Sequence, residues 1–362
     1  MKFFSCLFMI TILFVISANS DTIYLKNGLK QTEVTITKET CQYVYYKVKN
    51  SIKTKIDSYL IKQIEYSDAP VAFIDAQNAV LQKEYKNAIK WINESLKIAK
   101  KSKVIRNWIY HYAWFYKAQS YYGLARNSDD ENLYKKAISG YNETTKIAPG
   151  SRFVFDCLFQ KSKCYLHLKN FKKATKNTKE LLNLLKNMQK QYYWQYKAVM
   201  LSGDILFLQK KYSQALKQYQ KAQKILKNKQ KLQYLLNDVT IAIGKCYIFQ
   251  NEFYKAKRFF NSFRKKSIHN KNNKSLAAAK NGLALCYLKQ EKYHKALQES
   301  IEVVIKFPQT SKQHALALFF SSQCYKKLNN QNNAKIYYNL LKLAYPGIFA
   351  DIDWLEKLYQ TQ

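Results

Sequence analysis

A skeleton of small and aromatic residues recurs along most of this chain and constrains its fold more than any other feature. Each copy has a small residue, an aromatic residue three or nine positions later, and an alanine twelve positions later, except that an insertion lengthens the second copy. The clearest copy consists of Ala284, Tyr287, Tyr293 and Ala296, followed by Pro308. A unit of this size cannot bury its apolar face alone, so successive copies must stack on one another. The anchor alanines of the copies are Ala88, Ala137, Ala174, Ala215, Ala256, Ala296 and Ala334.

The skeleton resembles the tetratricopeptide repeat, which has small, Tyr, Ala, aromatic and Pro residues at these separations. The resemblance covers about residues 70–347. It implies a mainly α-helical chain: an α-solenoid of about seven helix pairs that forms a right-handed superhelix, with a concave groove lined by the first helix of each pair. Only 8 Gly and 4 Pro in 362 residues also favour helices, because turn-rich folds use many of both.

The spacing departs from the family in one respect. Successive anchor alanines are mostly 37 to 41 residues apart, with one interval of 49, whereas the family period is about 34. We therefore expect longer helices or longer loops than usual, and an extra loop around Asn127 to Asn132 in the second copy.

The segment before the repeats, residues 21–68, alternates apolar and polar residues with a period of two. Ile23 and Leu25 precede an Asn27-Gly28 turn, and further alternating runs follow. We expect four or five short strands that form a small β-sheet or open barrel. So few residues hold little core by themselves, so the module should lean on the helices that follow. At the other end, residues 348–362 are expected to form a capping helix.

The first twenty residues have the pattern of a secretory signal peptide. Lys2 precedes an apolar run from Phe3 to Ile16, and small residues at Ala18 and Ser20 precede the expected cleavage after Ser20. The run is too short to span a bilayer comfortably, although an uncleaved anchor stays an alternative. This pattern predicts an exported protein, in a periplasm, an extracellular space or a secretory lumen.

The net charge of +37 leaves two readings open. A basic surface can bind an anionic membrane, wall polymer or nucleic acid. Almost all of the cations are Lys, however, while Arg is the better residue for bidentate phosphate recognition. The excess of Lys, Asn, Ile and Tyr is also what an AT-rich genome would produce. The sequence shows no specific nucleic-acid site.

No constellation for chemistry appears in the sequence. There is no phosphate loop, dinucleotide fingerprint or nucleophile elbow, and the five His residues are scattered. We therefore expect no enzyme activity, no cofactor and no metal. Cysteines at one equivalent repeat position should lie about 10 Å apart, too far for disulfides, and are expected to be buried as free thiols. They are Cys164, Cys246, Cys286 and Cys324.

The resemblance also implies where a partner binds, because ligand-facing residues in such arrays lie one turn either side of the small residue on the first helix. An apolar stripe with charges of both signs would suit an extended or helical peptide. The alternative is that the apolar members are partly buried between repeats. The positions assigned to the groove are Tyr112, Phe115, Gln119, Asp156, Phe159, Lys163, Lys197, Met200, Asp204, Asp238, Ile241, Lys245, Phe319 and Gln323. The sequence thus favours an exported scaffold that binds protein or peptide partners, with a charge-driven binder of anionic surfaces as the alternative.

Overall fold

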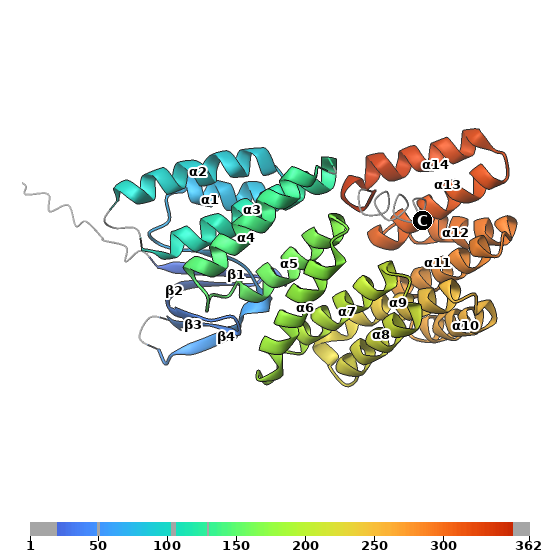
Figure 1. The fold of residues 1–362 in the computed structure, drawn as a ribbon, viewed down its shortest axis with the longest axis horizontal. Coiled ribbons are helices and arrows are strands. Elements are labelled where there is room, and N and C mark those ends of the chain that lie inside the picture. Colours follow the sequence, from blue (N-terminus) through green and yellow to red (C-terminus); the bar gives the residue numbers. More distant parts are fainter. Residues whose placement is uncertain (1–19, 49–50, 103–105, 129, 350–362) are drawn as a thin grey trace, which may run out of the picture.

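The computed structural model describes residues 20–48, 51–102, 106–128 and 130–349, and all structural statements below refer to these. The expected signal peptide and nearly all of the expected C-terminal capping helix lie outside them. The described chain is a curved solenoid of paired helices preceded by a small antiparallel sheet, so the predicted fold class is confirmed (Figure 1).

The N-terminal module is a five-stranded antiparallel sheet in the order β4-β3-β2-β1-β5. Ile23, Val34 and Val44 lie on its buried face, as their alternation with polar residues predicts. The fourth strand has almost no apolar residues, and no alternating pattern in the sequence predicts it. The strands are β1 (Asp21–Leu25), β2 (Lys30–Glu39), β3 (Tyr43–Val48), β4 (Thr54–Asp57) and β5 (Ile61–Glu65), and the 3₁₀ turn η1 (Ser58–Leu60) precedes β5.

Seven helix pairs follow the sheet. They are α1 (Val71–Leu81) and α2 (Tyr85–Lys101), α3 (Trp108–Ser128) and α4 (Glu131–Ile147), α5 (Val154–His167) and α6 (Phe171–Lys186), α7 (Tyr192–Leu208) and α8 (Tyr212–Leu226), α9 (Leu236–Phe249) and α10 (Phe253–His269), α11 (Asn273–Lys289) and α12 (Tyr293–Lys306), α13 (Ser311–Lys327) and α14 (Gln331–Ala344). A 3₁₀ segment, η2 (Gln230–Leu235), leads into α9.

The extra residues of the second repeat lengthen a helix instead of forming the expected loop. Helix α3 has 21 residues and continues to Ser128, while α4 begins at Glu131. The carboxylate of Asp130 accepts a hydrogen bond from the backbone N–H of Asn132 at 2.7 Å and caps α4. Asp130 therefore has a structural role at the start of α4.

The turns between the two helices of a pair contain no glycine at the position with a positive φ. A positive φ between 54° and 60° occurs at the residue shortly after the first helix in five pairs: Lys169, Lys210, Asn251, Glu291 and Asn329. This left-handed conformation closes the end of a helix and is usually taken by Gly, or by Asn. Here Lys and Glu adopt it as well, so the repeats turn without glycine.

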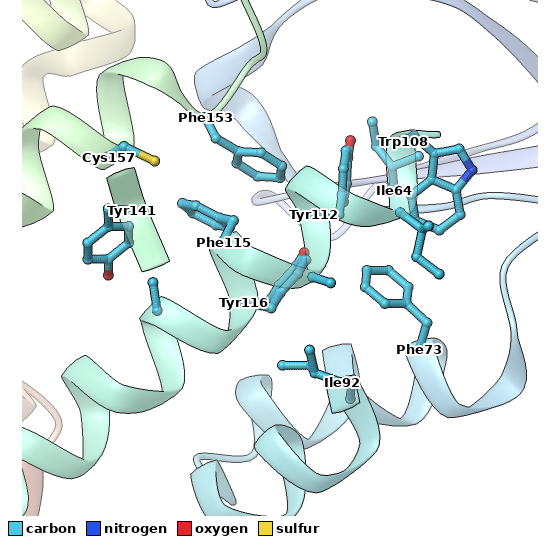
Figure 2. Close-up of a cluster of buried hydrophobic side chains, with 14 of the residues drawn as sticks. Ile64, Phe73, Ile92, Trp108, Tyr112, Phe115, Tyr116, Tyr141, Phe153 and Cys157 are labelled. Atoms are coloured by element: carbon cyan, nitrogen blue, oxygen red, sulfur yellow. The ribbon is translucent and has the colours of Figure 1, made fainter. Parts of the chain in front are cut away.

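The sheet docks on the start of the solenoid through a cluster of aromatic rings (Figure 2). The ring of Tyr66 stacks on Trp108 with centroids 4.2 Å apart, and Phe73 meets Trp108 edge to face. Farther along, Tyr59 of the sheet module stacks on Tyr193 at the start of α7, at 4.7 Å. The β module therefore packs against the first four repeats and is not a separate unit.

Buried polar groups hold the same junction together. The carboxylate of Glu39 accepts hydrogen bonds from the hydroxyls of Tyr66 and Tyr112, the latter at 2.8 Å, and lies 3.6 Å from Arg152. Nearby, Arg106 bridges the carboxylates of Asp21 at 3.0 Å and Asp68 at 2.7 Å. Because these groups have partners, their burial does not leave unpaired charges in the core.

The pairs follow a curve that brings the last pair back towards the far end of α3 (Figure 1). The guanidinium of Arg126 there donates a hydrogen bond to the backbone carbonyl of Gly347 at 2.7 Å. Residues 221 positions apart in sequence thus touch. In the described chain no helix is both long and apolar enough to cross a membrane.

Candidate functional site: the inner face of the central repeats

The first helices of the pairs line the inner surface of the curve: α5 packs against α7, α9 against α11 and α11 against α13, and Lys245 of α9 reaches the ring of Phe207 on α7. On α5, α7 and α9, three positions spaced i, i+3 and i+7 share one face of the helix. The outer two positions are charged and the middle one is apolar, and each of the nine side chains is half-buried or exposed. The triplets are Asp156, Phe159 and Lys163 on α5, Lys197, Met200 and Asp204 on α7, and Asp238, Ile241 and Lys245 on α9.

The charges alternate in sign from helix to helix. The first row reads Asp156, Lys197, Asp238, and the second row, seven residues later on each helix, reads Lys, Asp, Lys. The apolar residues form a middle row between them. We call this arrangement of nine residues the inner-face lattice.

Asp204 shows that the lattice charges interact across helices. Burial raises the pKa of the Asp204 carboxyl, while Lys245 of α9, Lys197 of α7 and Lys163 of α5 lower it. The Tyr219 hydroxyl also donates a hydrogen bond to this carboxylate at 2.8 Å. Solvent reaches Asp204, yet protein surrounds it on several sides, as expected for a group on a concave surface.

The other lattice charges have neighbours of opposite sign as well. Burial raises the pKa of Asp156, and Lys26, Arg152 and Lys197 oppose this shift. Burial likewise lowers the pKa of Lys197 and of Lys245, and nearby aspartates oppose it in both cases. Four of the six lattice charges, those of Asp156, Lys197, Asp204 and Lys245, are therefore partly desolvated, which strengthens their interaction with a charged ligand.

Aromatic rings lie beside the lysines of the lattice. The ammonium of Lys197 lies 4.5 Å from the ring centre of Phe159, and that of Lys245 lies 5.2 Å from the ring centre of Phe207. Such cation–π contacts hold Lys197 beside the apolar row and Lys245 against α7.

The next two first helices close the C-terminal side of the lattice. Helices α9, α11 and α13 pack against one another. Lys312 of α13 pairs with Asp238 of α9 at 2.7 Å, and the buried amide of Asn281 donates to the backbone and side-chain oxygens of Gln313 at 2.8 and 3.0 Å. The accessible part of the inner face is therefore centred on α5, α7 and α9.

Two residues assigned to the groove from sequence lie in the core instead. Tyr112 is fully buried, with its hydroxyl on Glu39, and Phe115 stacks on Phe153 at 3.9 Å (Figure 2). The β module and the segment around Arg152 cover the groove position of the second repeat. These two side chains are thus unavailable to a ligand in this structure, which corrects their assignment.

The remaining assigned residues lie at the edges of the inner face. Gln119 is half-buried on α3, and Phe319 and Gln323 are half-buried on α13. They do not belong to the three adjacent helices of the lattice. Sequence reasoning missed Lys26, Arg152 and Lys312, whose charges act on lattice residues. None of these occupies a repeat position that the pattern marks, so no sequence signal identified them.

The described chain holds no group of three or more His, Cys, Asp or Glu side chains placed to bind a metal. Its six cysteines are free, and the four at the equivalent repeat position are buried, as expected. A surface cavity of about 1330 Å³ lies along α6 and the C-terminal half of α7, lined by residues such as Leu184 and Leu206. Leu206 lies on the side of α7 opposite Lys197 and Met200, so this cavity is separate from the lattice.

Helix pairs stacked into a curve, with an accessible inner face, define this protein as an α-solenoid of the tetratricopeptide-repeat type with an N-terminal β module. No protein-family model matches the sequence, and no curated protein matches it.

Solved structures with the same fold are similar to it at low sequence identity. The apo form of the quorum sensor NprR from B. thuringiensis has a TM-score of 0.54 at 15% identity, over 75% of this chain and 74% of that one. A tetratricopeptide repeat protein from Parabacteroides merdae has a TM-score of 0.52 at 12% identity, over 81% and 99%. Aspartyl phosphate phosphatase F from Bacillus subtilis has a TM-score of 0.52 at 15% identity, over 76% and 70%.

Proposed function

We propose that this protein is an exported, non-enzymatic scaffold that binds a protein or peptide partner on its inner face. The observation that carries the proposal is the inner-face lattice, in which an apolar row lies between two rows of accessible charges. Apolar anchors supply affinity and flanking charges set orientation in peptide recognition by grooves. The rigid packing of seven helix pairs keeps the surface preformed, which lowers the entropic cost of binding.

The proposal of export rests on the first twenty residues alone. If the signal peptide is cleaved after Ser20, the mature chain starts at Asp21, the first residue of β1. N-terminal sequencing of the protein recovered from its source would then read Asp-Thr-Ile-Tyr. A chain that begins at Met1 would contradict this proposal.

The partner can be sought by affinity capture from the secreted or envelope fraction of the source, with residues 21–362 as bait. The test variant changes Phe159, Met200 and Ile241 to Ala and so removes the apolar row. The matched control changes three exposed apolar residues of α12 and α14 to Ala instead: Ile305, Ile336 and Leu343.

We expect specific proteins to be retained at moderate salt by the wild-type chain and by the control, and to be lost with the test variant. The competing function is charge-driven binding of a membrane, wall polymer or nucleic acid. Material that is anionic, released by salt and equally retained by all three baits would establish that alternative and overturn the proposal, because exposed charge pairing is screened by salt.

A further inference from the structure

We propose that the inner-face lattice selects an extended, polyproline-II-like peptide whose apolar residues recur at every third position and whose flanking charges alternate in sign. This inference rests on the proposed function, because it names the class of peptide that the same face would bind.

The first step is a match of lengths across the helices. The apolar residues Phe159, Met200 and Ile241 lie on three neighbouring first helices, and packed helices are about 8–10 Å apart. A polyproline-II chain advances about 9.3 Å per turn of three residues. In a β-strand, side chains on the same face are about 6.7 Å apart, which is shorter than the spacing of the helices. Only the three-residue period places one anchor over each helix.

The second step is the direction of the side chains between the anchors. With three residues per turn, one side chain in each turn points down and the other two point up and outwards, to either side. Along each helix, the charged positions lie about 4.5 Å before and about 6 Å after the apolar position. The two outward residues of each turn therefore reach one charged row each.

The third step is the sign of the charges that the ligand must carry. The first row consists of Asp156, Lys197 and Asp238. A complementary ligand therefore presents a positive, a negative and a positive side chain along this row. The second row reads Lys, Asp, Lys and requires minus, plus, minus. A peptide with the order Lys-Leu-Glu-Glu-Leu-Lys-Lys-Leu-Glu satisfies all six positions in one of its two chain directions.

The structure also shows what such a peptide would displace. Lys312 forms an ion pair with Asp238, and the ammonium group of Lys197 lies over the ring of Phe159. Both ammonium groups sit on long, flexible side chains and can turn towards solvent or the ligand. The pair of Lys312 and Asp238 is exposed, and such pairs are worth little, so its exchange for ligand contacts is not prevented.

The test compares two fluorescent peptides of identical composition with blocked ends. One has the alternating order given above, and the other is Lys-Leu-Glu repeated three times. Both have leucine at positions 2, 5 and 8, and they differ only in the order of the middle three residues. Nine-residue peptides are too short to form stable helices in water, so intrinsic helicity does not decide the result.

Binding is measured by fluorescence anisotropy at low ionic strength with the chain of residues 21–362. We expect the alternating peptide to bind about tenfold more tightly, because the repeated order puts like charges against Lys197 and Asp204. The double variant K197D/D204K makes each row uniform in sign without a change of net charge. It should reverse the preference and bind the repeated peptide more tightly.

A second swap keeps the inference testable if the first variant does not fold, as judged by its thermal unfolding. D238K/K245D should prefer Lys-Leu-Glu-Glu-Leu-Lys-Glu-Leu-Lys, which again has the same composition. Wild type that does not distinguish the peptides or binds neither, or swaps that leave the preference unchanged, would overturn the inference.

The failure of the inference and that of the proposed function are distinguishable. If the peptides bind without preference and binding is lost when Phe159, Met200 and Ile241 are changed to Ala, the inner face remains the binding surface and only the charge rule fails. If this triple variant binds the peptides as wild type does, the inner face is not the site and both fail.

Discussion

A Cβ atom on Gly244 of α9 would lie 2.1 Å from the ring carbon Cζ of Phe260 on α10. No real Cβ makes so short a contact, so the two helices cross at this distance only because residue 244 has no side chain. A Cβ atom on Gly282 of α11 would likewise lie 2.2 Å from the ring carbon Cε1 of Phe260. The Phe260 ring thus fills the space that two glycines leave between successive repeats.

We predict that Gly244→Ala destabilises the protein by about 1–3 kcal/mol, the usual cost of overpacking a core, even though Ala is the better helix former. Urea unfolding measures the change. Gly150→Ala serves as the control, because a Cβ at Gly150 meets nothing within 4 Å. Equal stability of the two variants would show that α9 and α10 can separate at little cost.

The ion pair between Arg152 and Glu39 gives a second prediction. Both side chains are almost fully buried, so Arg152→Met leaves a carboxylate in the core without its cation and should cost about 3 kcal/mol. The double variant E39Q/R152M removes both charges. The amide oxygen of the glutamine can still accept from one of the two tyrosine hydroxyls, and its NH2 group can donate to the other. It should regain at least half of the lost stability in denaturant unfolding. The guanidinium of Arg152 also lies 4.5 Å from the ring centre of Phe153. A double variant as unstable as the single one would mean that Arg152 stabilises through this ring contact rather than through its ion pair with Glu39.

Two histidines make the stability depend on pH. Burial lowers the pKa of His111 to about 4 and that of His167 to about 3, and neighbouring cations act in the same direction. In the unfolded chain the pKa is about 6.5, so between these values the unfolded state binds more protons. The free energy of unfolding is therefore unaffected by these two histidines above pH 6.5, and it falls as the pH decreases below that value. The loss at pH 5 should be about 2 kcal/mol for each histidine.

The variant His167→Phe tests this effect, because a phenyl ring preserves the stacking of His167 on Tyr134 at 4.7 Å. Its unfolding free energy should decrease less than that of wild type between pH 7.5 and pH 5. His294→Gln on an exposed position should leave the pH profile unchanged. A profile of His167→Phe that coincides with wild type would show that His167 is not kept neutral by the fold.

The contact between Arg126 and Gly347 predicts how the two ends of the curve depend on each other. The backbone amides of Ile348 and Phe349 bond to the carbonyl of Tyr345 in the same segment. Loss of one hydrogen bond of about 1 kcal/mol in Arg126→Ala should speed their hydrogen exchange about fivefold. The control Arg258→Ala changes an exposed side chain on α10 and should leave the hydrogen exchange of Ile348 and Phe349 unchanged. Unchanged exchange in Arg126→Ala would mean that the last pair holds this segment without α3.

The repeat architecture could be predicted because its signal is local. The small residue and the alanine of each copy belong to the two helices of one pair. Their separation, which is twelve in every copy except the second, therefore reports the crossing of two helices that are consecutive in the sequence. The alternation of Ile23, Val34 and Val44 is equally local to the sheet. Where the local pattern was weak, in β4 and in the lengthened α3, the expectation was incomplete or wrong, because neither element carries a distinctive periodicity.

The candidate site divides in the same way. The sequence alone determined the fold class and the equivalent positions on the first helices, since these follow from periodicity within each repeat. Only the tertiary structure decided which of those positions are accessible. Tyr112 and Phe115 are buried by a sheet and a loop that are distant in sequence, and the charges around Asp204 come together from three helices. Burial and electrostatics depend on which segments meet in space, and a repeat pattern does not record how a separate module docks or how tightly the array curves.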